Sequence, residues 1–176
     1  MFNKIRTLVT VVLLLITPFC WAEADRSKPL QLAEPLQQFA PYVGKTWRGE
    51  FSDSTAAKPM IDVSHWSVAL QGQAVRITHS LNQGEYEGET MIVFNGQTQQ
   101  LEFFYFTTAG FYTIGRAEFD GSAFVSYEQV SGNSDGITEV KAEINLVDAN
   151  TMTQQAHYLK NGRWVKGHSA RYRVVE

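Results

Sequence analysis

The chain has 176 residues, and its 15 lysines and arginines against 18 aspartates and glutamates give a formal charge of −3 at pH 7. This length suits one domain with a single core and is short for two. Because the chain is mildly acidic, it is a poor candidate for binding nucleic acid or an anionic membrane surface.

Residues 1–24 have the parts of a secretory signal peptide. Lys4 and Arg6 supply the positive n-region, and an apolar run follows over residues 8–16. That run is shorter than the roughly 20 apolar residues that a membrane-spanning helix needs. We therefore expect a periplasmic or secreted protein with no membrane span once this segment is removed.

Two cleavage sites close the predicted signal peptide, near Ala22 and near Ala24. Cleavage at either would also remove Cys20, the only cysteine, and with it any disulfide, thiolate metal site or cysteine nucleophile. Two alternatives stay open: an uncleaved membrane anchor, and a lipoprotein modified at Cys20. Bulky Phe19, directly before Cys20, disfavours lipidation.

Residues 25–44 form a linker and a short helix. Apolar residues recur at roughly helical spacing over residues 30–43. Pro35 divides this stretch and is suited to the first turn of a helix over residues 36–40, which Pro41 then stops. We expect this helix to plug or cover one end of the domain that follows.

The remaining domain, residues 45–176, is a succession of runs rich in β-branched and aromatic residues, each ended by a turn signal after about 8–13 residues. The expected strands cover residues 45–52, 60–70, 73–81, 85–94, 99–106, 111–119, 122–130, 137–147, 151–159 and 164–175. Consecutive strands joined by hairpins pair with each other. The fold class is therefore all-β: a single antiparallel up-and-down barrel of about ten strands with a short N-terminal helix.

Alternation along each strand predicts which side chains face the barrel interior, because successive residues point to opposite faces. In the third expected strand His79 shares the apolar face, and in the last strand the even-numbered residues share it, which leaves Arg171 and Arg173 on the outer face. The expected inward residues include Val75, Ile77, His79, Leu81, Phe103, Tyr105, Tyr158, Trp164, Lys166, His168 and Tyr172.

The first strand opens with Gly44-Lys45-Thr46-Trp47-Arg48-Gly49, directly after the short helix. This start resembles the calycin superfamily of lipocalins and fatty-acid-binding proteins, and it is also similar to the heme-binding nitrobindins and to secreted barrel domains of unknown function. The resemblance implies a barrel closed by Trp47, with an arginine of the last strand, Arg171 or Arg173, stacked over its ring.

We expect a binding or carrier protein for a small hydrophobic or amphipathic ligand, because an apolar interior with inward tyrosines and histidines suits an apolar molecule with a polar head. The candidate ligand-binding residues are His79, Phe103, Tyr105, Tyr158, His168 and Tyr172. One alternative is an isomerase or cyclase that uses His79 as an acid/base residue. Another is a filled barrel that acts as an interaction domain.

We assign no catalytic residue and no metal site, because the histidines lack the spacing of known motifs. We also expect no cofactor and a monomer. The nitrobindin resemblance leaves one alternative open, a heme bound through His168 or His157.

Overall fold

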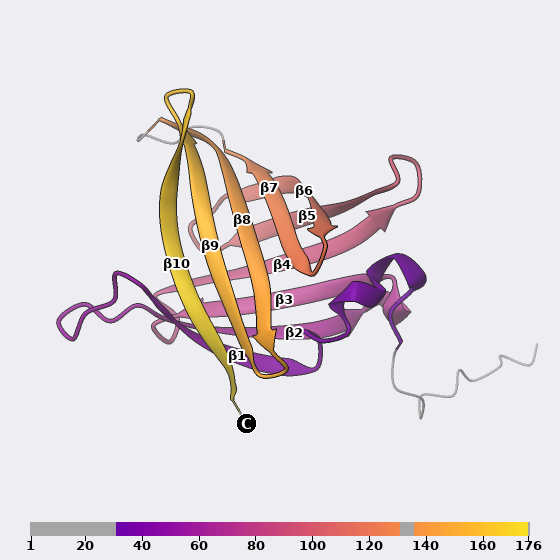
Figure 1. The fold of residues 1–176 in the computed structure, drawn as a ribbon, viewed down its shortest axis with the longest axis horizontal. Helices are drawn as coiled ribbons and strands as arrows, with labels where there is room; N and C mark the ends of the chain where they lie inside the picture. The colour runs from indigo at the N-terminus through magenta and orange to yellow at the C-terminus, as the bar shows by residue number, and fades with distance from the viewer. Residues whose placement is uncertain (1–30, 131–135, 176) are drawn as a thin grey trace, which may run out of the picture.

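The computed structural model describes residues 31–130 and 136–175, so the predicted signal peptide lies outside the described residues. Ten strands and two short 3₁₀ helices follow one another (Figure 1). Their bounds are η1 (Glu34–Phe39), β1 (Lys45–Phe51), β2 (Ile61–Ala69), η2 (Leu70–Gly72), β3 (Ala74–Leu81), β4 (Tyr86–Asn95), β5 (Gln100–Thr107), β6 (Tyr112–Asp120), β7 (Ala123–Gln129), β8 (Ile137–Asp148), β9 (Thr151–Lys160) and β10 (Arg163–Val175).

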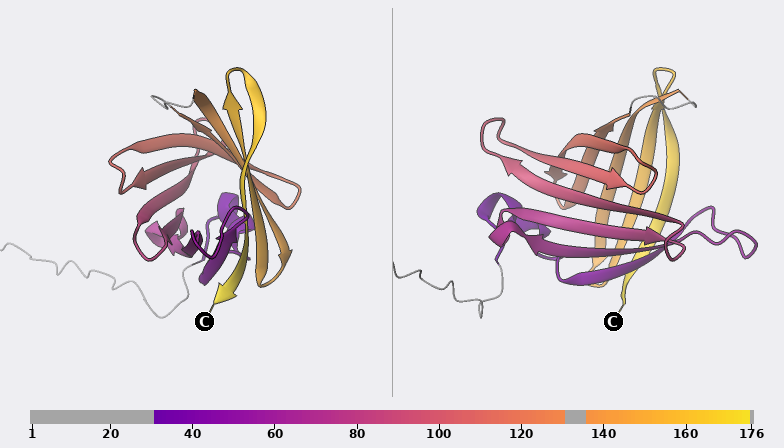
Figure 2. Two further views of the ribbon diagram at one scale, coloured as in Figure 1. Left: turned by 90° about the vertical axis from the view of Figure 1, so that its left-hand side faces the viewer. Right: turned by 180° about the vertical axis from the view of Figure 1, so that it is seen from behind.

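The strands close into one antiparallel barrel in which each strand pairs with its neighbours in sequence and β1 pairs with β10. This arrangement confirms the predicted up-and-down barrel, and each expected strand end lies within one residue of the observed end. The barrel is strongly twisted, with β8 to β10 running steeply across the direction of β1 to β4 (Figures 1 and 2). Closure leaves no long unpaired strand edge along which the described chain could aggregate.

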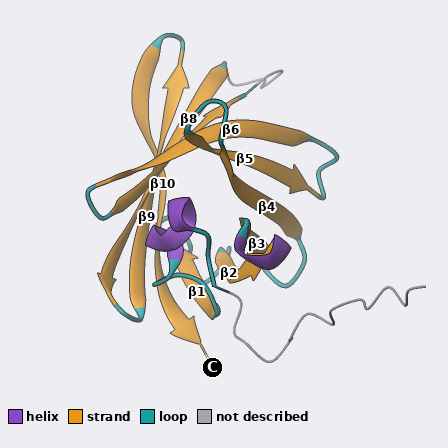
Figure 3. Cartoon of the chain, turned by 90° about the vertical axis from the view of Figure 1, so that its right-hand side faces the viewer, coloured by secondary structure: helices purple, strands orange, loops and turns teal. Residues whose placement is uncertain are grey.

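The predicted helix is a 3₁₀ helix and begins at Glu34, with Pro35 in its first turn. A 3₁₀ helix has three residues per turn, so Leu36 and Phe39 lie on the same side, and both are buried. Phe39 packs edge-on against Phe119 and Phe124, with ring centroids 4.9 and 5.0 Å away. The helix therefore plugs one end of the barrel (Figure 3), and its residues Leu36 and Phe39 belong to the buried apolar core.

The pattern of inward residues holds for most of the barrel but fails in the first half of β10. A β-bulge lies between Lys166 and Ser169, where the pairing with β9 shifts. Trp164 pairs with outward-facing Leu159, so Trp164 and Lys166 lie on the outer side, and the inward prediction for both was wrong. After the bulge the even residues point inward, as predicted for His168 and Tyr172.

The two ends of the barrel differ. Connections that follow odd-numbered strands lie at one end, and those that follow even-numbered strands lie at the other, beside η1. We call the first end the mouth and the second the plugged end. Within the described residues, no helix is long and apolar enough to cross a membrane.

Candidate functional site

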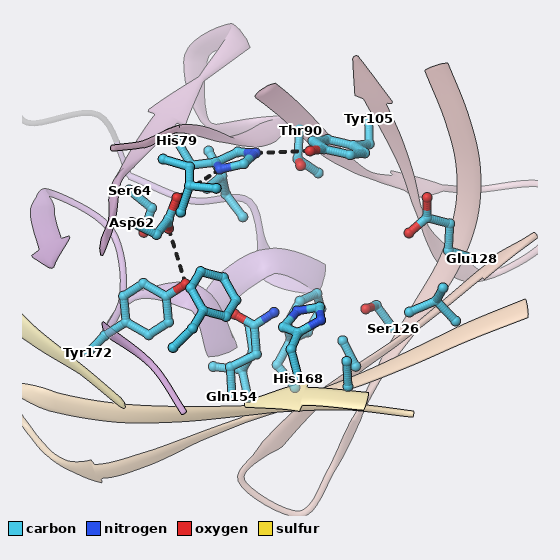
Figure 4. A pocket seen from close by; sticks show the side chains of 18 of the residues that line it. Asp62, Ser64, His79, Thr90, Tyr105, Ser126, Glu128, Gln154, His168 and Tyr172 are labelled. Carbon is cyan, nitrogen blue, oxygen red and sulfur yellow. Dashed lines mark hydrogen bonds and ion pairs between the residues drawn. The ribbon is translucent and has the colours of Figure 1, made fainter. Parts of the chain in front are cut away.

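The barrel encloses a cavity of about 580 Å³, so it is hollow rather than filled. Near the plugged end the lining is apolar, with Trp66 and Phe124 in contact with Phe39 of the plug. The lining at the mouth ends of the strands includes polar residues, among them Asp62, His79 and Glu128. Figure 4 shows the polar side chains of the lining. All six predicted ligand-binding residues line this cavity: His79, Phe103, Tyr105, Tyr158, His168 and Tyr172.

Five side chains, each from a different strand, are linked by hydrogen bonds along the cavity wall, and we call them the hydrogen-bonded chain. His79 of β3 lies at its centre, with Nδ1 2.9 Å from Oδ1 of Asp62 and Nε2 2.9 Å from the hydroxyl of Tyr105. The Tyr105 hydroxyl lies 2.8 Å from that of Tyr86, and the Tyr172 hydroxyl donates to Oδ2 of Asp62 at 3.1 Å. The chain therefore joins β4, β5, β3, β2 and β10 through their side chains.

The chemistry of the groups sets the direction of these hydrogen bonds. An ionised carboxylate only accepts, so Nδ1 of His79 donates to Asp62. In a neutral imidazole the other nitrogen then accepts, so the Tyr105 hydroxyl donates to Nε2 and accepts from Tyr86. These donor and acceptor roles are assigned from the hydrogen-bond partners of each group. Burial, with the hydrogen bond to Tyr86 as a further cause, raises the pKa of Tyr105 above its ordinary value, which keeps the hydroxyl protonated.

Asp62 accepts two of the hydrogen bonds in the hydrogen-bonded chain, although the sequence analysis did not select it. Its side chain is buried, with the residue 4% exposed, and both carboxylate oxygens accept a hydrogen bond. Burial and the neighbouring carboxylate of Asp62 raise the pKa of Tyr172. Strand alternation could have found Asp62, since it shares the inward face of β2 with Ser64 and Trp66.

A glycine makes room for the central contact. Gly88 of β4 lies opposite His79, and a Cβ there would come within 2.5 Å of His79 Nε2 and 2.4 Å of the Tyr105 ring. Both contacts are closer than a Cβ tolerates. The His79–Tyr105 hydrogen bond therefore depends on the absence of a side chain at this position.

A second polar pair lies on the wall formed by β9 and β10. The Tyr158 hydroxyl is hydrogen-bonded to Nδ1 of His168, and the centroid of the His168 ring lies 5.1 Å from that of Phe51. Burial lowers the pKa of His168, which favours the neutral imidazole that accepts from Tyr158. Gly167, at the bulge, leaves space for the Tyr158 ring.

Glu128 of β7 is a further cavity residue that the sequence analysis missed. It lies on the same wall as Ser126, apart from the His79 chain (Figure 4). Burial raises the pKa of its carboxyl group. Asp53 and Asp62 add two more carboxylates to the lining, and among the described residues no lysine or arginine lines the cavity.

The predicted closure of the barrel by an arginine over Trp47 is not observed. The Trp47 ring is fully buried, and its Nε1 donates to the carbonyl of Tyr42 at 3.2 Å. Arg171 and Arg173 are exposed on the outer face, because they alternate with inward Tyr172. The cation near the Trp47 ring is Lys45, with Nζ 5.3 Å from the ring centroid.

The histidines do not form a metal site. Within residues 31–130 and 136–175, no group of three or more histidine, cysteine, aspartate or glutamate side chains could hold a metal ion. His157 faces outward, where it pairs with Lys141 and Lys166. Of the two histidines considered for heme, His168 alone lines the cavity, and heme binding stays an untested prediction.

No protein-family model and no curated protein matches the chain. Among solved structures, the chain is similar to the crystal structure of Rv2717c from M. tuberculosis, with a TM-score of 0.58 and 10% sequence identity. The match covers 83% of this chain and 100% of that chain. At this identity the likeness concerns the barrel fold, and the calycin resemblance stays a prediction.

Proposed function

We propose that the barrel binds one small amphipathic molecule in its cavity, as a carrier does. The observation that supports this proposal is the hollow interior of about 580 Å³. Ligand pockets in proteins commonly have volumes of about 300–1,000 Å³ and combine apolar walls with a few placed polar groups. The apolar plugged end suits the body of such a ligand, and the tyrosines, histidines and carboxylates near the mouth suit its head.

The charges of the lining restrict the head group. Asp53, Asp62 and Glu128 line the cavity, and no basic residue does so within the described part of the chain. An anionic head would enter without a counter-charge, which is costly in a buried site. We therefore expect a neutral or cationic head that forms hydrogen bonds, rather than a fatty-acid carboxylate.

The first experiment is native mass spectrometry of protein purified from the soluble fraction without detergent. An additional mass that disappears on denaturation supports the proposal and gives the mass of the ligand. The predicted export stays a prediction, and the intact mass of the same protein tests it, since cleavage at Ala22 or Ala24 leaves distinct masses.

A matched pair of variants tests whether the cavity is the site. Ala142 lines the cavity on β8, and Asn145 lies exposed on the outer face of the same strand. Ala142→Phe should weaken binding of the neutral apolar dye Nile red at least about tenfold by filling space, whereas Asn145→Phe should leave it unchanged. Equal binding by both variants, or no dye binding and no bound mass in the wild type, would contradict the proposal.

One observation favours the isomerase or cyclase as a second candidate. Asp62, His79 and Tyr105 form a continuous hydrogen-bonded row, in which a buried carboxylate orients an imidazole beside a protonated hydroxyl. Such a row can move a proton to or from a bound molecule. Incubation with the ligand identified by mass spectrometry should then yield a rearranged product, and His79→Gln should abolish turnover while leaving the fold intact. Recovery of unchanged ligand from the wild type would exclude this activity.

A further inference from the structure

The hairpin of β9 and β10 extends past the barrel wall at the mouth (Figures 1 and 2). Asn161 and Gly162 form its tight turn, and both have positive φ values, 50° and 74°. Trp164 and Val165 point to opposite faces of the strand, yet they are 48% and 41% exposed. Exposure on both faces means that no layer formed by the described residues of the barrel covers this part of the hairpin.

The tip of this hairpin is basic. Lys160, Arg163 and Lys166 are exposed and lie within seven residues that contain no acidic side chain. Lys160 and Arg163 lie directly opposite each other in the register of the two strands. Like charges at directly paired positions are unfavourable, so an external anion would relieve a repulsion that already exists in the fold.

Apolar side chains accompany this charge at the mouth. Trp164 and Val165 follow Arg163 on β10. On the β5–β6 hairpin, at the same end of the barrel, Phe106 and Tyr112 are at least half exposed and their rings lie 6.0 Å apart. Tryptophan and tyrosine beside lysine and arginine are typical of surfaces that lie at the boundary between lipid and water.

We propose that the β9–β10 hairpin docks the mouth of the barrel on an anionic phospholipid bilayer. The basic residues would approach the lipid head groups, and Trp164 would enter the interface. This docking rests on the proposed carrier function for its purpose, because an amphipathic ligand concentrates in bilayers and could pass to the cavity without crossing bulk water.

The negative net charge of the chain does not oppose this docking. At physiological ionic strength the Debye length is about 8 Å, so exposed charges farther away are largely screened. The described acidic residues at the mouth include Asp53, Glu85, Glu87, Glu128 and Glu139, and all of them lie on other strands or loops, whereas the tip of the β9–β10 hairpin carries only basic charged residues. The local charge of the hairpin, rather than the total, therefore decides which surface it meets.

A lipid surface fits these features better than an anionic macromolecule. Nucleic-acid binding generally requires a larger basic surface, and the chain as a whole is acidic. An acidic protein partner would account for the three cations but not for the aromatic side chains of two separate hairpins at the mouth. The bilayer accounts for both kinds of side chain.

Co-sedimentation with vesicles tests the proposal in three forms of the full chain. The wild type is compared with Lys160→Gln/Arg163→Gln/Lys166→Gln and with a control, Arg48→Gln/Arg171→Gln/Arg173→Gln, which removes the same charge from exposed positions away from the hairpin tip. All forms carry the same N-terminal residues, so any contribution from these cancels. We expect the hairpin variant to lose about a hundredfold in affinity for vesicles of phosphatidylglycerol and phosphatidylcholine, and the control less than about tenfold.

Tryptophan fluorescence provides a second readout. Trp47 and Trp66 are buried, and Trp21 of the predicted signal peptide is common to all forms, so the part of the quenching by brominated phosphatidylcholine in the anionic vesicles that is lost in Trp164→Tyr would report on Trp164. Quenching in the wild type, and its loss in Trp164→Tyr, would support insertion of this side chain.

Equal loss of affinity in both triple variants would overturn the proposal, and so would absence of vesicle binding by the wild type. The latter result would point to an acidic protein partner instead. These outcomes are independent of the cavity, since binding of Nile red and a bound mass test the carrier function separately.

Discussion

Asp62 and His79 face each other across β2 and β3, and the 2.9 Å hydrogen bond between them places a buried carboxylate against an imidazole inside the barrel. The cavity therefore contains a fixed polar centre rather than scattered polar atoms. Four of its five residues lie on the consecutive strands β2 to β5, and only the contact of Tyr172 on β10 requires the barrel to be closed.

Substitutions at Asp62 and Tyr172 should show whether the hydrogen-bonded chain around His79 stabilises the fold. Tyr172→Phe removes one hydrogen bond and should lower the free energy of unfolding by about 1 kcal/mol. Asp62→Ala leaves the buried Tyr172 hydroxyl and the half-buried His79 Nδ1 without their acceptor and should cost about 3 kcal/mol. Urea denaturation measures both. In the double variant Tyr172→Phe should cost almost nothing further, and full additivity would show that the two side chains are not coupled.

Gly88→Ala should disrupt the hydrogen bond between His79 and Tyr105 without removing either side chain. The new Cβ would overlap Nε2 of His79 and the ring of Tyr105, so one of them must move and the hydrogen bond between them should break. We expect a loss of about 1–3 kcal/mol in stability and weaker dye binding. Gly96→Ala is the control, since nothing lies within 4 Å of a Cβ there. If the two variants unfold at the same urea concentration, the crowding at Gly88 is absent in solution.

Phe39→Ala should show that the plug is part of the core. Phe39 is fully buried and packs against Trp66, Phe119 and Phe124, so its truncation should cost about 3–5 kcal/mol. Phe111→Ala removes the same side chain from a half-exposed position and should cost far less. Thermal unfolding of the two variants compares them directly. Similar losses would mean that η1 detaches from the barrel in solution.

Glu128→Gln should change how stability depends on pH. Burial raises the folded-state pKa of Glu128, so between the unfolded value near 4.5 and the raised value the folded state binds more protons. Its contribution is therefore fully favourable below about pH 4.5 and is lost as pH rises through the folded pKa. Glutamine does not ionise, so Glu128→Gln avoids the loss of stability that the wild type undergoes as the buried carboxyl ionises. The variant should therefore be more stable than the wild type at pH 7.

Urea midpoints measured from pH 4 to pH 8 check this sign. The gain from Glu128→Gln should shrink toward pH 4, where the carboxyl is protonated in both the folded and the unfolded chain. A variant that is less stable than the wild type at pH 7 would show that the ionised carboxylate is favourably paired.

The sequence by itself determined the barrel and most of its interior. Period-two alternation and turn residues act over a few positions, so they predicted ten strands with ends within one residue of those observed, and they placed His79, Phe103, Tyr105, Tyr158 and Tyr172 inward. They failed at Trp164 and Lys166, because a β-bulge reverses the alternation; the isolated glycine Gly167 inside the expected strand was the local signal that could have predicted it.

Only the tertiary structure decided how these residues meet. Asp62 and Tyr172 are 110 positions apart in sequence, and the closure of β1 on β10 brings them together. The hollow interior is the volume left between side chains of many strands, which no single segment encodes. The net charge of the whole chain likewise did not predict the basic β9–β10 tip. A net charge sums over all residues and does not say which charges the folded barrel brings together.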